Sequence, residues 1–592
     1  MVDAHRRQLN ASGARPAETI GTVSRMLGDG ASREYLGNPI QPTITRVKKP
    51  RTFETALQRM KKDELIRGEI PPVKDVPEAV QTAAALLIEA SMDAFSYRKA
   101  ALAGVADPSA EFQRETSSLP NSDDAVVYQR QMALSRNVEM SYMYAAAQEL
   151  TTAAVEAKNI VGASGQKQDY KFELDTEWGK ISLTGGNVNI HEGGPTFIAI
   201  DTSGDDTWVN PACNQTLQNW ASFCIDTQGK DFFVSHPALK GTAVAAWQER
   251  SNHRGLSGPC SAAFGISAIC DSEGDDVYRT ARSGLGSALF GVAYLLDDSG
   301  DDFYDAYAEA EGYGRFGIGI LEDRAGKDIY QGFSQVQGCG SPRGAGVLLD
   351  RLGDDTYTAN DQVIDFASPQ SPEHNFSMAQ GAGVGFRSDY LNGRSQAGGI
   401  GILLDGAGSD RYSCGVYGQG VGYWMGTGLL LDNSGDDTYE GFWYSGGVGA
   451  LFGVGYLEDI QGKDQYTGAR NANMGVGFDF AVGMFIEGTG DDKYTTSTLS
   501  LGASSENGIG VFIDQGGIDT YACSGLSMGQ SSEASKNSLR ERALAVGLFL
   551  DLDGLDKYPT SVPFAKNQQQ SVNWRDKLPI PSESQLGVFM DR

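Results

Sequence analysis

The sequence has 592 residues, of which 75 are glycine and 40% are hydrophobic. Asp and Glu number 76 against 48 Lys and Arg, so the formal net charge is −28. This hydrophobic content is enough to bury a core, whereas the acidic balance disfavours nucleic acid and anionic membranes as partners. No apolar run is long enough for a transmembrane helix, and the first residues lack the apolar segment of a signal peptide.

The seven cysteines include no CxxC pair and fit no zinc spacing. We expect them to be small buried residues with free thiols. Local disulfides between Cys213 and Cys224, and between Cys260 and Cys270, are the alternative in an oxidising compartment. The cysteines therefore do not decide the compartment.

Residues 1–75 are basic, contain several prolines and show little apolar periodicity. We expect a basic, extended or disordered arm, which could lie along the acidic body of the same chain. In residues 76–165 apolar residues recur at helical spacing. They predict a helical hairpin, with helices at about 76–102 and 125–160, that caps the N-terminal end of the remaining chain.

Residues 166–592 repeat one octapeptide pattern, an acid, two residues, Gly, one residue, Asp, one residue and an aromatic. Successive motif glycines are mostly 25–28 residues apart. The aromatic is Trp208, then Phe233, then Tyr from Tyr278 to Tyr558. The first acids, called leading acids below, are Asp201, Asp226, Asp271, Asp297, Asp323, Asp350, Asp405, Asp432, Asp459, Glu487, Asp514 and Asp551. The second acids, called trailing aspartates, are Asp206, Asp231, Asp276, Asp302, Asp328, Asp355, Asp410, Asp437, Asp464, Asp492, Asp519 and Asp556.

The repeat length decides the fold class. A propeller blade needs about 40–45 residues, and the glycines and alternating apolar residues exclude helical repeats. An apolar strand precedes each turn, which predicts a mainly β chain with an N-terminal α-helical region. We expect a right-handed parallel β-solenoid of about 12–13 coils over 166–592, with insertions near 234–262, 358–399 and 559–584. Equivalent aromatics should stack, with Tyr439 between Tyr412 and Tyr466.

Stacked coils place equivalent acids about 4.8 Å apart, where each neighbouring pair repels by roughly 3.5 kcal/mol at an effective dielectric constant of 20. Bound cations are one remedy. Hydrogen bonds from the turn to the leading acid, as in an Asx-turn, are a second. Lysine within the ladder, the name used below for the stacked columns of acids, is a third remedy, since Lys230, Lys327 and Lys463 follow the motif glycine.

The stretches GDDTYEG at 435–441 and GDDTYTA at 353–359 resemble the haemolysin-type (RTX) calcium-binding nonapeptide GGxGxDxUx. Members of that family form parallel β-rolls in which Asp and turn carbonyls hold Ca²⁺ between turns. The family repeats every nine residues, whereas this motif recurs once per coil and has Asp in place of the first Gly. The resemblance implies Ca²⁺ ligands at Asp201, Asp206, Asp271, Asp276, Asp297, Asp302, Asp323, Asp328, Asp350, Asp355, Asp405, Asp410, Asp432, Asp437, Asp459, Asp464, Asp492, Asp514 and Asp519.

We predict no catalytic residues, because the chain has five histidines and no HExxH, GxSxG or P-loop motif. Two insertions carry polar groups, and such loops either hold binding residues or are merely tolerated. The Tyr390 to Gly398 spacing suggests a degenerate coil within the second insertion. The polar groups are His236, Lys240, Glu249, Arg250, His253 and Arg254 in the first, and Asp365, Glu373, His374, Arg387 and Asp389 in the second.

The leading hypothesis is a Ca²⁺-stabilised, extracytoplasmic structural or adhesive protein, with a polysaccharide or another cell-surface component as partner. The alternatives are a polysaccharide-acting lyase or hydrolase and an intracellular scaffold. A lyase should show Lys or Arg beside clustered acids in a lateral cleft, analogous to other parallel β-helix enzymes. The uncapped ends of a solenoid would allow homo-oligomers.

The last residues repeat the strand and leading Asp of a further coil. We expect this strand to close the stack, with Val588 and Met590 buried against Leu548–Leu550. The polar tail before it, with Pro579, Pro581 and its glutamines, should cover the edge.

Overall fold

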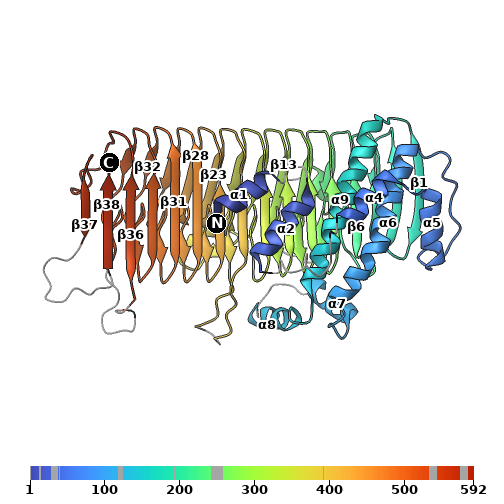
Figure 1. The fold of residues 1–592 in the computed structure, drawn as a ribbon, viewed down its shortest axis with the longest axis horizontal. Helices are drawn as coiled ribbons and strands as arrows, with labels where there is room; N and C mark the ends of the chain where they lie inside the picture. Colours follow the sequence, from blue (N-terminus) through green and yellow to red (C-terminus); the bar gives the residue numbers. More distant parts are fainter. Residues whose placement is uncertain are drawn as a thin grey trace. The chain divides into compact units, whose positions relative to one another are not determined.

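The computed structural model describes residues 2–11, 15–28, 38, 40–117, 124–192, 194–241, 258–390, 393–532, 540, 543–573 and 585–592. Two compact units, Met1–Asp328 (unit 1) and Ile329–Arg592 (unit 2), divide the chain. The described chain is mainly β, with long parallel sheets and an N-terminal helical region, as predicted (Figure 1).

The segment 1–75 is helical rather than extended, so that prediction was wrong for its described residues. Pro16 and Pro42 stand in the first turn of their helices, where proline is tolerated, and they do not interrupt them. Apolar side chains such as Ile20 and Leu57 are buried and provide the packing that the expected arm lacked. The helices are α1 (Val2–Ala11), α2 (Pro16–Met26), α4 (Gln41–Lys48) and α5 (Phe53–Lys62).

Two long helices, α6 (Glu78–Ala101) and α9 (Met140–Ser164), pack on each other and on strands of unit 1 (Figure 1). Helix α6 agrees with the helix predicted at about 76–102. The single helix predicted at about 125–160 is two helices in the structure, α8 (Asp124–Leu134) and α9, with a turn between them. A further helix, α7 (Pro108–Ser117), lies between the two predicted helices.

In unit 1 the repeats form three sheets, in which parallel strands one repeat apart are paired in register, for example Tyr278 with Tyr304. The first sheet begins with the antiparallel pair β1 (Tyr170–Thr176) and β2 (Gly179–Gly185). It continues in parallel with β4 (Thr196–Ile200), β6 (Ala221–Ile225), β9 (Ile266–Cys270), β12 (Val292–Leu296) and β15 (Ile318–Glu322). The second holds β3 (Ile190–His191), β5 (Thr207–Val209), β7 (Phe232–Val234), β10 (Val277–Arg282) and β13 (Phe303–Ala308). The third holds β8 (Ser261–Ala263), β11 (Ser287–Leu289) and β14 (Gly314–Arg315).

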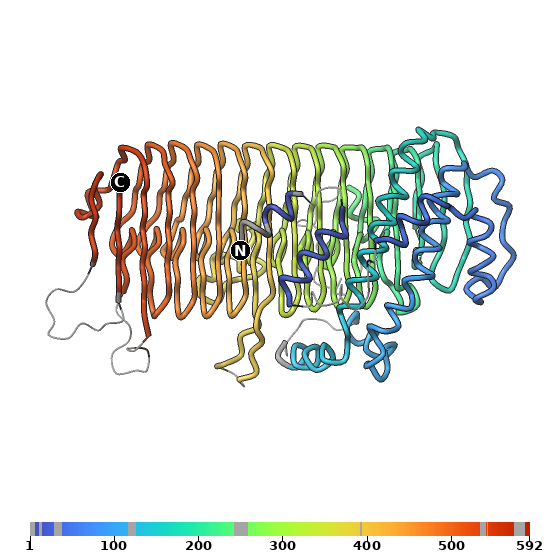
Figure 2. Tube along the Cα trace, viewed as in Figure 1, coloured from blue at the N-terminus to red at the C-terminus, as the bar shows by residue number. Residues whose placement is uncertain are grey.

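Unit 2 has the same arrangement, and Figure 2 shows its trace passing from one repeat to the next. Its first sheet holds β17 (Ala345–Leu349), β22 (Ile400–Leu404), β25 (Thr427–Leu431), β28 (Val454–Gln461), β31 (Val482–Thr489), β34 (Ile509–Asp514), β36 (Ala545–Asp551) and β38 (Gln585–Asp591). The second holds β16 (Ile329–Gly332), β18 (Thr356–Ala359), β23 (Arg411–Gly418), β26 (Thr438–Ser445), β29 (Gln465–Gly468), β32 (Lys493–Thr495) and β35 (Thr520–Ala522). The third holds β21 (Gly383–Val384), β24 (Gly422–Tyr423), β27 (Gly449–Ala450), β30 (Gly477–Phe478) and β33 (Ser504–Ser505).

The second insertion contains an extra set of strands, but not where the spacing of Tyr390 and Gly398 placed it. β20 (Ser371–Ala379) pairs with β19 (Ala367–Ser368) and β23, and β21 pairs with β24. Tyr390 itself is 70% exposed and stands outside the aromatic column. Gly381, with a φ of +77°, supplies the turn between β20 and β21 that the sequence pattern did not reveal.

At the C-terminal end of unit 2, β38 pairs in parallel with β36, as predicted. The face assignment was wrong, because Val588 and Met590 are only half-buried while Phe589 is buried and stacks on Phe549. Strand alternation puts Phe589 on the inner face. β37 (Gln570–Asn573) pairs antiparallel with β38, so part of the polar tail covers this edge. Pro579 and Pro581 lie outside the described residues.

The predicted aromatic column is confirmed: the Tyr439 ring centroid lies 4.6 Å from that of Tyr412 and 4.7 Å from that of Tyr466. All seven cysteines are free and buried, so the two local disulfides do not form in this structure.

Candidate functional site

The repeated turn brings both acids of the motif out of the solvent. The leading acid lies at or near the end of a strand of the first sheet, and in most repeats the trailing aspartate precedes a strand of the second. Asp432 is fully buried and Asp437 is 1% exposed. The motif glycine between them, Gly435, is required by close backbone approach, since a Cβ there would lie 1.7 Å from the Gly408 carbonyl oxygen.

Most leading acids accept a hydrogen bond from their own turn, from an aromatic residue, or from both, although Asp350, Asp405, Asp459 and Asp551 leave Oδ1 without a partner. The Ser434 backbone N–H donates to Asp432 Oδ1 over 3.1 Å, which confirms the predicted Asx-turn. The Tyr412 hydroxyl donates to Asp432 Oδ2 over 2.7 Å. Equivalent hydroxyl bonds join Tyr278 to Asp297, Tyr304 to Asp323, Tyr330 to Asp350, Tyr357 to Asp405, Tyr439 to Asp459, Tyr466 to Glu487, Tyr494 to Asp514 and Tyr521 to Asp551.

Sequence reasoning missed this role of the tyrosine hydroxyl. The signal was the near-exclusive choice of Tyr in the aromatic column, where Phe would fill the core equally well. Trp208 serves the same purpose, since its Nε1–H donates to Asp226 over 3.1 Å.

Each trailing aspartate uses one oxygen to join neighbouring repeats. The backbone N–H of Asp410 donates to Asp437 Oδ1 over 2.6 Å, and that of Asp437 donates to Asp464 Oδ1 over 2.7 Å. The other oxygen, Oδ2, is buried without a hydrogen-bond partner in Asp231, Asp276, Asp302, Asp410, Asp437, Asp464, Asp492, Asp519 and Asp556. A buried carboxylate oxygen without a partner costs folding free energy. These oxygens therefore require a proton or a bound cation.

The two columns meet in groups of three carboxylates. In unit 1, one oxygen each from Asp231, Asp271 and Asp276 lies within 4.8 Å of the others, and all three residues are buried. The same grouping recurs as Asp206, Asp226 and Asp231; as Asp276, Asp297 and Asp302; and as Asp302, Asp323 and Asp328. A trailing aspartate is therefore shared between successive groups, with oxygen as the only ligand type.

Burial and mutual repulsion raise the pKa values of these acids. Burial, followed by the charges of neighbouring acids, raises the pKa of Asp437 to about 9 and that of Asp276 to about 12. For Asp464, burial and the charge of Asp492 raise the pKa to about 8. A fully ionised ladder is thus unstable by itself at neutral pH, and each group requires a proton or a cation.

Lysine offsets the negative charge of a third set of acids, the aspartates directly after the motif glycine, which form an exposed column. Asp205, Asp275, Asp301, Asp354, Asp436 and Asp491 are exposed. The Lys230 ammonium lies 3.3 Å from Asp275, and the Lys463 backbone N–H donates to Asp436 over 3.0 Å. The proposed lysine remedy therefore acts at the surface and leaves the buried columns unbalanced.

The first repeat of unit 1 is closed by a histidine. The His191 ring stacks on Trp208 with centroids 3.6 Å apart, and its Nε2 lies 3.4 Å from Asp201 Oδ2. Although burial lowers it, hydrogen bonds and charges of Asp201 and Asp206 raise the pKa of His191 above its ordinary value. At the last repeat of unit 2, Asn567 Oδ1 accepts the N–H of Asp556 over 2.7 Å in place of an aspartate.

The described polar residues of the insertions are not assembled into one site. Lys240 Nζ donates to Thr207 over 2.6 Å, and His236 Nδ1 accepts the Ala238 N–H. His374 Nδ1 lies 2.6 Å from Asp361 Oδ2, and the ring stacks on Phe442. Arg387 forms a separate ion pair with Asp389, Glu373 is exposed, and Asp365 contributes its backbone N–H to Asn375. Glu249, Arg250, His253 and Arg254 lie outside the described residues.

A cluster that the sequence did not suggest lies on β10, β13 and the β14 edge of unit 1. Arg279 Nε is 3.3 Å from the buried Asp305, and Arg282 Nε is 3.6 Å from Glu309. Arg315 lies 4.0 Å from the other oxygen of Glu309. Burial raises the pKa of Glu309, but the two guanidinium charges bring it below its usual value. Four of these residues occupy ordinary strand positions, Glu309 directly follows β13, and no motif could have identified the cluster.

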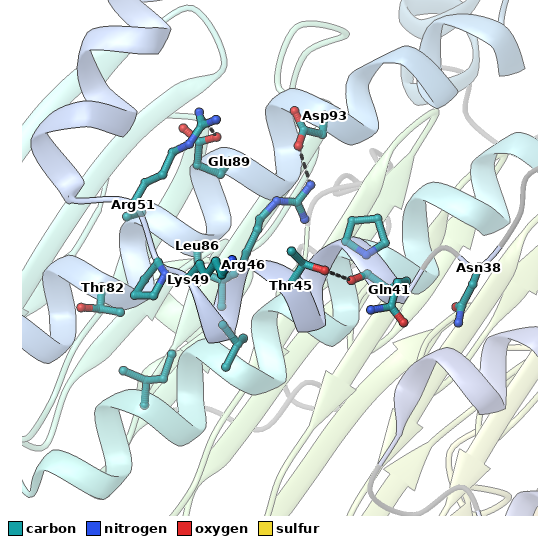
Figure 3. A pocket seen from close by; sticks show the side chains of 15 residues that line it. Asn38, Gln41, Thr45, Arg46, Lys49, Arg51, Thr82, Leu86, Glu89 and Asp93 are labelled. Atoms are coloured by element: carbon teal, nitrogen blue, oxygen red, sulfur yellow. Dashed lines mark hydrogen bonds and ion pairs between the residues drawn. The ribbon is translucent and has the colours of Figure 1, made fainter.

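The helical region of unit 1 encloses a cavity of about 650 Å³ (Figure 3). Most of its charged lining is paired internally: Arg46 contacts Asp93 at 2.6 Å and Glu149 at 2.7 Å, and Arg51 contacts Glu89 at 2.9 Å. Arg46 thereby links α4 to α6 and α9, and Arg51, before α5, is linked to α6. Because these charges are used within the helical region, the cavity is secondary to the carboxylate ladder as a candidate site.

Comparison with protein-family models, with curated proteins and with solved structures gives no match. Among the described helices, none combines the length and apolar character needed to span a bilayer.

Proposed function

We propose that this protein is a structural parallel β-solenoid whose buried acid ladder binds Ca²⁺, with one ion per repeat. The solenoid is supported by the strand pairing, because neighbouring parallel strands in all three sheets lie one repeat apart in the sequence. This pairing fits about 12–13 right-handed coils of 25–28 residues each. Its role is mechanical and adhesive rather than catalytic.

The observation that carries the proposal is the charge imbalance inside the ladder. Each repeat buries one leading acid and one trailing aspartate, and the unpartnered trailing oxygens face other carboxylates. Two negative charges per repeat are neutralised by one divalent cation. A single shared proton would leave one charge per repeat buried and unbalanced.

The donor set favours Ca²⁺ among divalent cations. The groups offer carboxylate oxygens, and the turns add carbonyl oxygens, which are the ligands that Ca²⁺ prefers. Zinc and copper favour imidazole or thiolate, whereas the four groups named above consist of aspartates alone. The haemolysin-type resemblance of the turns points to the same ion.

A Ca²⁺-dependent scaffold suits an extracytoplasmic setting, since extracellular modules work at Ca²⁺ concentrations of about 10⁻⁴–10⁻³ M. We propose a polysaccharide or another cell-surface component as the partner. The exposed aspartate column, which includes Asp275 and Asp436, presents acidic groups at regular spacing for further cation-mediated contacts.

The test is metal analysis of the purified protein before and after EGTA. We expect about one Ca²⁺ per motif repeat, and loss of the ion should lower the melting temperature. The double variant Asp437→Asn/Asp464→Asn should bind less Ca²⁺, whereas the matched control Asp436→Asn, on the exposed column, should bind the full amount. Protein without stoichiometric Ca²⁺ and without a response to EGTA would refute the proposal.

A second candidate is a polysaccharide lyase or hydrolase, and the observation that favours it is the arginine–acid cluster of Arg279, Arg282, Asp305, Glu309 and Arg315. Guanidinium groups beside acids could orient a uronate and move a proton. Release of unsaturated or reducing ends from acidic polysaccharides, lost in Arg282→Ala, would select this function. Inactivity towards such polysaccharides would leave the structural role.

A further inference from the structure

Among the described leading acids that follow an aromatic residue of the column, one lacks the donor that the others have. Its aromatic residue is Phe233, which carries no hydroxyl, while Trp208 before it and Tyr278 after it both donate to their leading acids. Phe233 is fully buried, and its ring centroid lies 4.7 Å from that of Tyr278 in the same stack. The column therefore continues through this repeat, and only the hydrogen bond is missing.

The missing donor leaves Asp271 incompletely satisfied. Its Oδ1 accepts the Ser272 N–H over 2.6 Å, but its Oδ2 is buried without a hydrogen-bond partner. Among leading acids in the part of the chain that the structure describes, Asp271 alone has an unpartnered Oδ2, whereas Asp350, Asp405, Asp459 and Asp551 leave Oδ1 unpartnered. The Oδ2 atoms of Asp231 and Asp276 lack partners as well. All three residues form one of the buried carboxylate groups.

We propose that the group of Asp231, Asp271 and Asp276 is the tightest divalent-cation site of the ladder, because Phe233 leaves free for the ion the leading-acid Oδ2 that a tyrosine hydroxyl or the Trp208 indole occupies in other repeats. At tyrosine repeats the hydroxyl competes for that oxygen. This inference rests on the proposed function and adds to it a defined first site of loading, with Ca²⁺ or Mn²⁺ as ligand.

Nearby positive charge does not replace the ion. Lys158 of α9 lowers the pKa of Asp271 through its charge, yet burial and the neighbouring acids Asp297 and Asp226 raise it further. The Lys158 ammonium is itself paired with Asp298. The protein therefore supplies no cation that compensates this carboxylate group, and the group must take up protons or bind a metal ion.

The test uses the full chain, stripped with EGTA and titrated with Mn²⁺, whose anomalous scattering locates it in crystals. At one Mn²⁺ per chain, we expect the strongest peak between Asp231, Asp271 and Asp276. Phe233→Tyr supplies the missing donor and should weaken the tightest site about tenfold, the value of one hydrogen bond to a charged group. The same variant should melt higher than wild type in EGTA, because Asp271 gains a partner.

Tyr278→Phe is the matched converse, since it removes the donor to Asp297 in the next group. It should create a second tight site among Asp276, Asp297 and Asp302. Loading of other groups before this one, or unchanged affinity in Phe233→Tyr, would overturn the inference while leaving the proposed function intact. Absence of divalent binding anywhere in the chain would overturn both.

Discussion

In most repeats a tyrosine hydroxyl donates a hydrogen bond to a leading acid. The sequence predicted the stacking of the tyrosine rings but not these hydrogen bonds. Stacking of Tyr439 followed from the repeat and is confirmed. Its hydroxyl also donates to Asp459 over 2.8 Å and to Asp432 over 3.3 Å. The shorter bond joins Tyr439 to the leading acid of the next repeat, so the pattern within one motif did not reveal it, and the near-exclusive choice of Tyr was its only signal.

Two variants separate stacking from hydrogen bonding at this position. Tyr439→Ala removes a buried aromatic and should lower the free energy of unfolding by about 3–5 kcal/mol. Tyr439→Phe keeps the ring and loses only the bonds to charged groups, so we expect a loss of about 1.5–3 kcal/mol. Denaturant unfolding measures both. Equal losses for the two variants would show that the ring, rather than its hydroxyl, accounts for all the stability.

At the scale of elements, the regular repeats were predictable and the N-terminal region was not. The period of 25–28 residues predicted the parallel strands, because each strand repeats the same apolar pattern and turn chemistry. In residues 1–75, prolines at helix starts and a small number of apolar residues concealed α2, α4 and α5. These helices are stabilised by packing against other helices and strands, so the local sequence alone does not reveal them.

The motif turn tolerates no side chain where backbones of successive turns meet. Gly408→Ala would place a Cβ 1.4 Å from the Gly353 carbonyl oxygen, so the turns would have to separate. We expect a loss of about 3 kcal/mol, as for severe overpacking. The control is Gly68→Ala, whose Cβ would meet nothing within 4 Å and should change the melting temperature little. A tolerated Gly408→Ala would contradict the close stacking of the turns.

At the scale of the whole molecule, the acid columns could be listed from the sequence, but their burial could not. The sequence left three remedies for the charge open. The structure confirms turn hydrogen bonds at leading acids and confines lysine to the exposed column. It also reveals unpartnered trailing oxygens, which depend on how neighbouring repeats align and so have no signature within one motif.

The strand pair at the C-terminal end of unit 2 predicts the behaviour of a truncated chain. β38 covers the edge of β36, and β37 covers β38. Deletion of 585–592 removes β38 and its pairing, exposing the strand edge of β36, which favours edge-to-edge association. We expect concentration-dependent oligomers by light scattering. A truncated protein as monodisperse as the full chain would show that β38 is not an edge cap.

The pH dependence of melting, with and without Ca²⁺, tests the central claim most directly. The folded-state pKa of Asp437 is about 9, above about 3.9 for an unfolded Asp, so the metal-free folded chain binds more protons between these values. The ladder's contribution to stability is complete below the unfolded pKa and is lost as pH rises through the folded pKa. In EGTA the melting temperature should therefore fall from about pH 6 to pH 9. With excess Ca²⁺ it should stay level or rise, because the ion replaces protons and binds carboxylates. The same pH dependence in EGTA and in Ca²⁺ would contradict a cation-stabilised ladder.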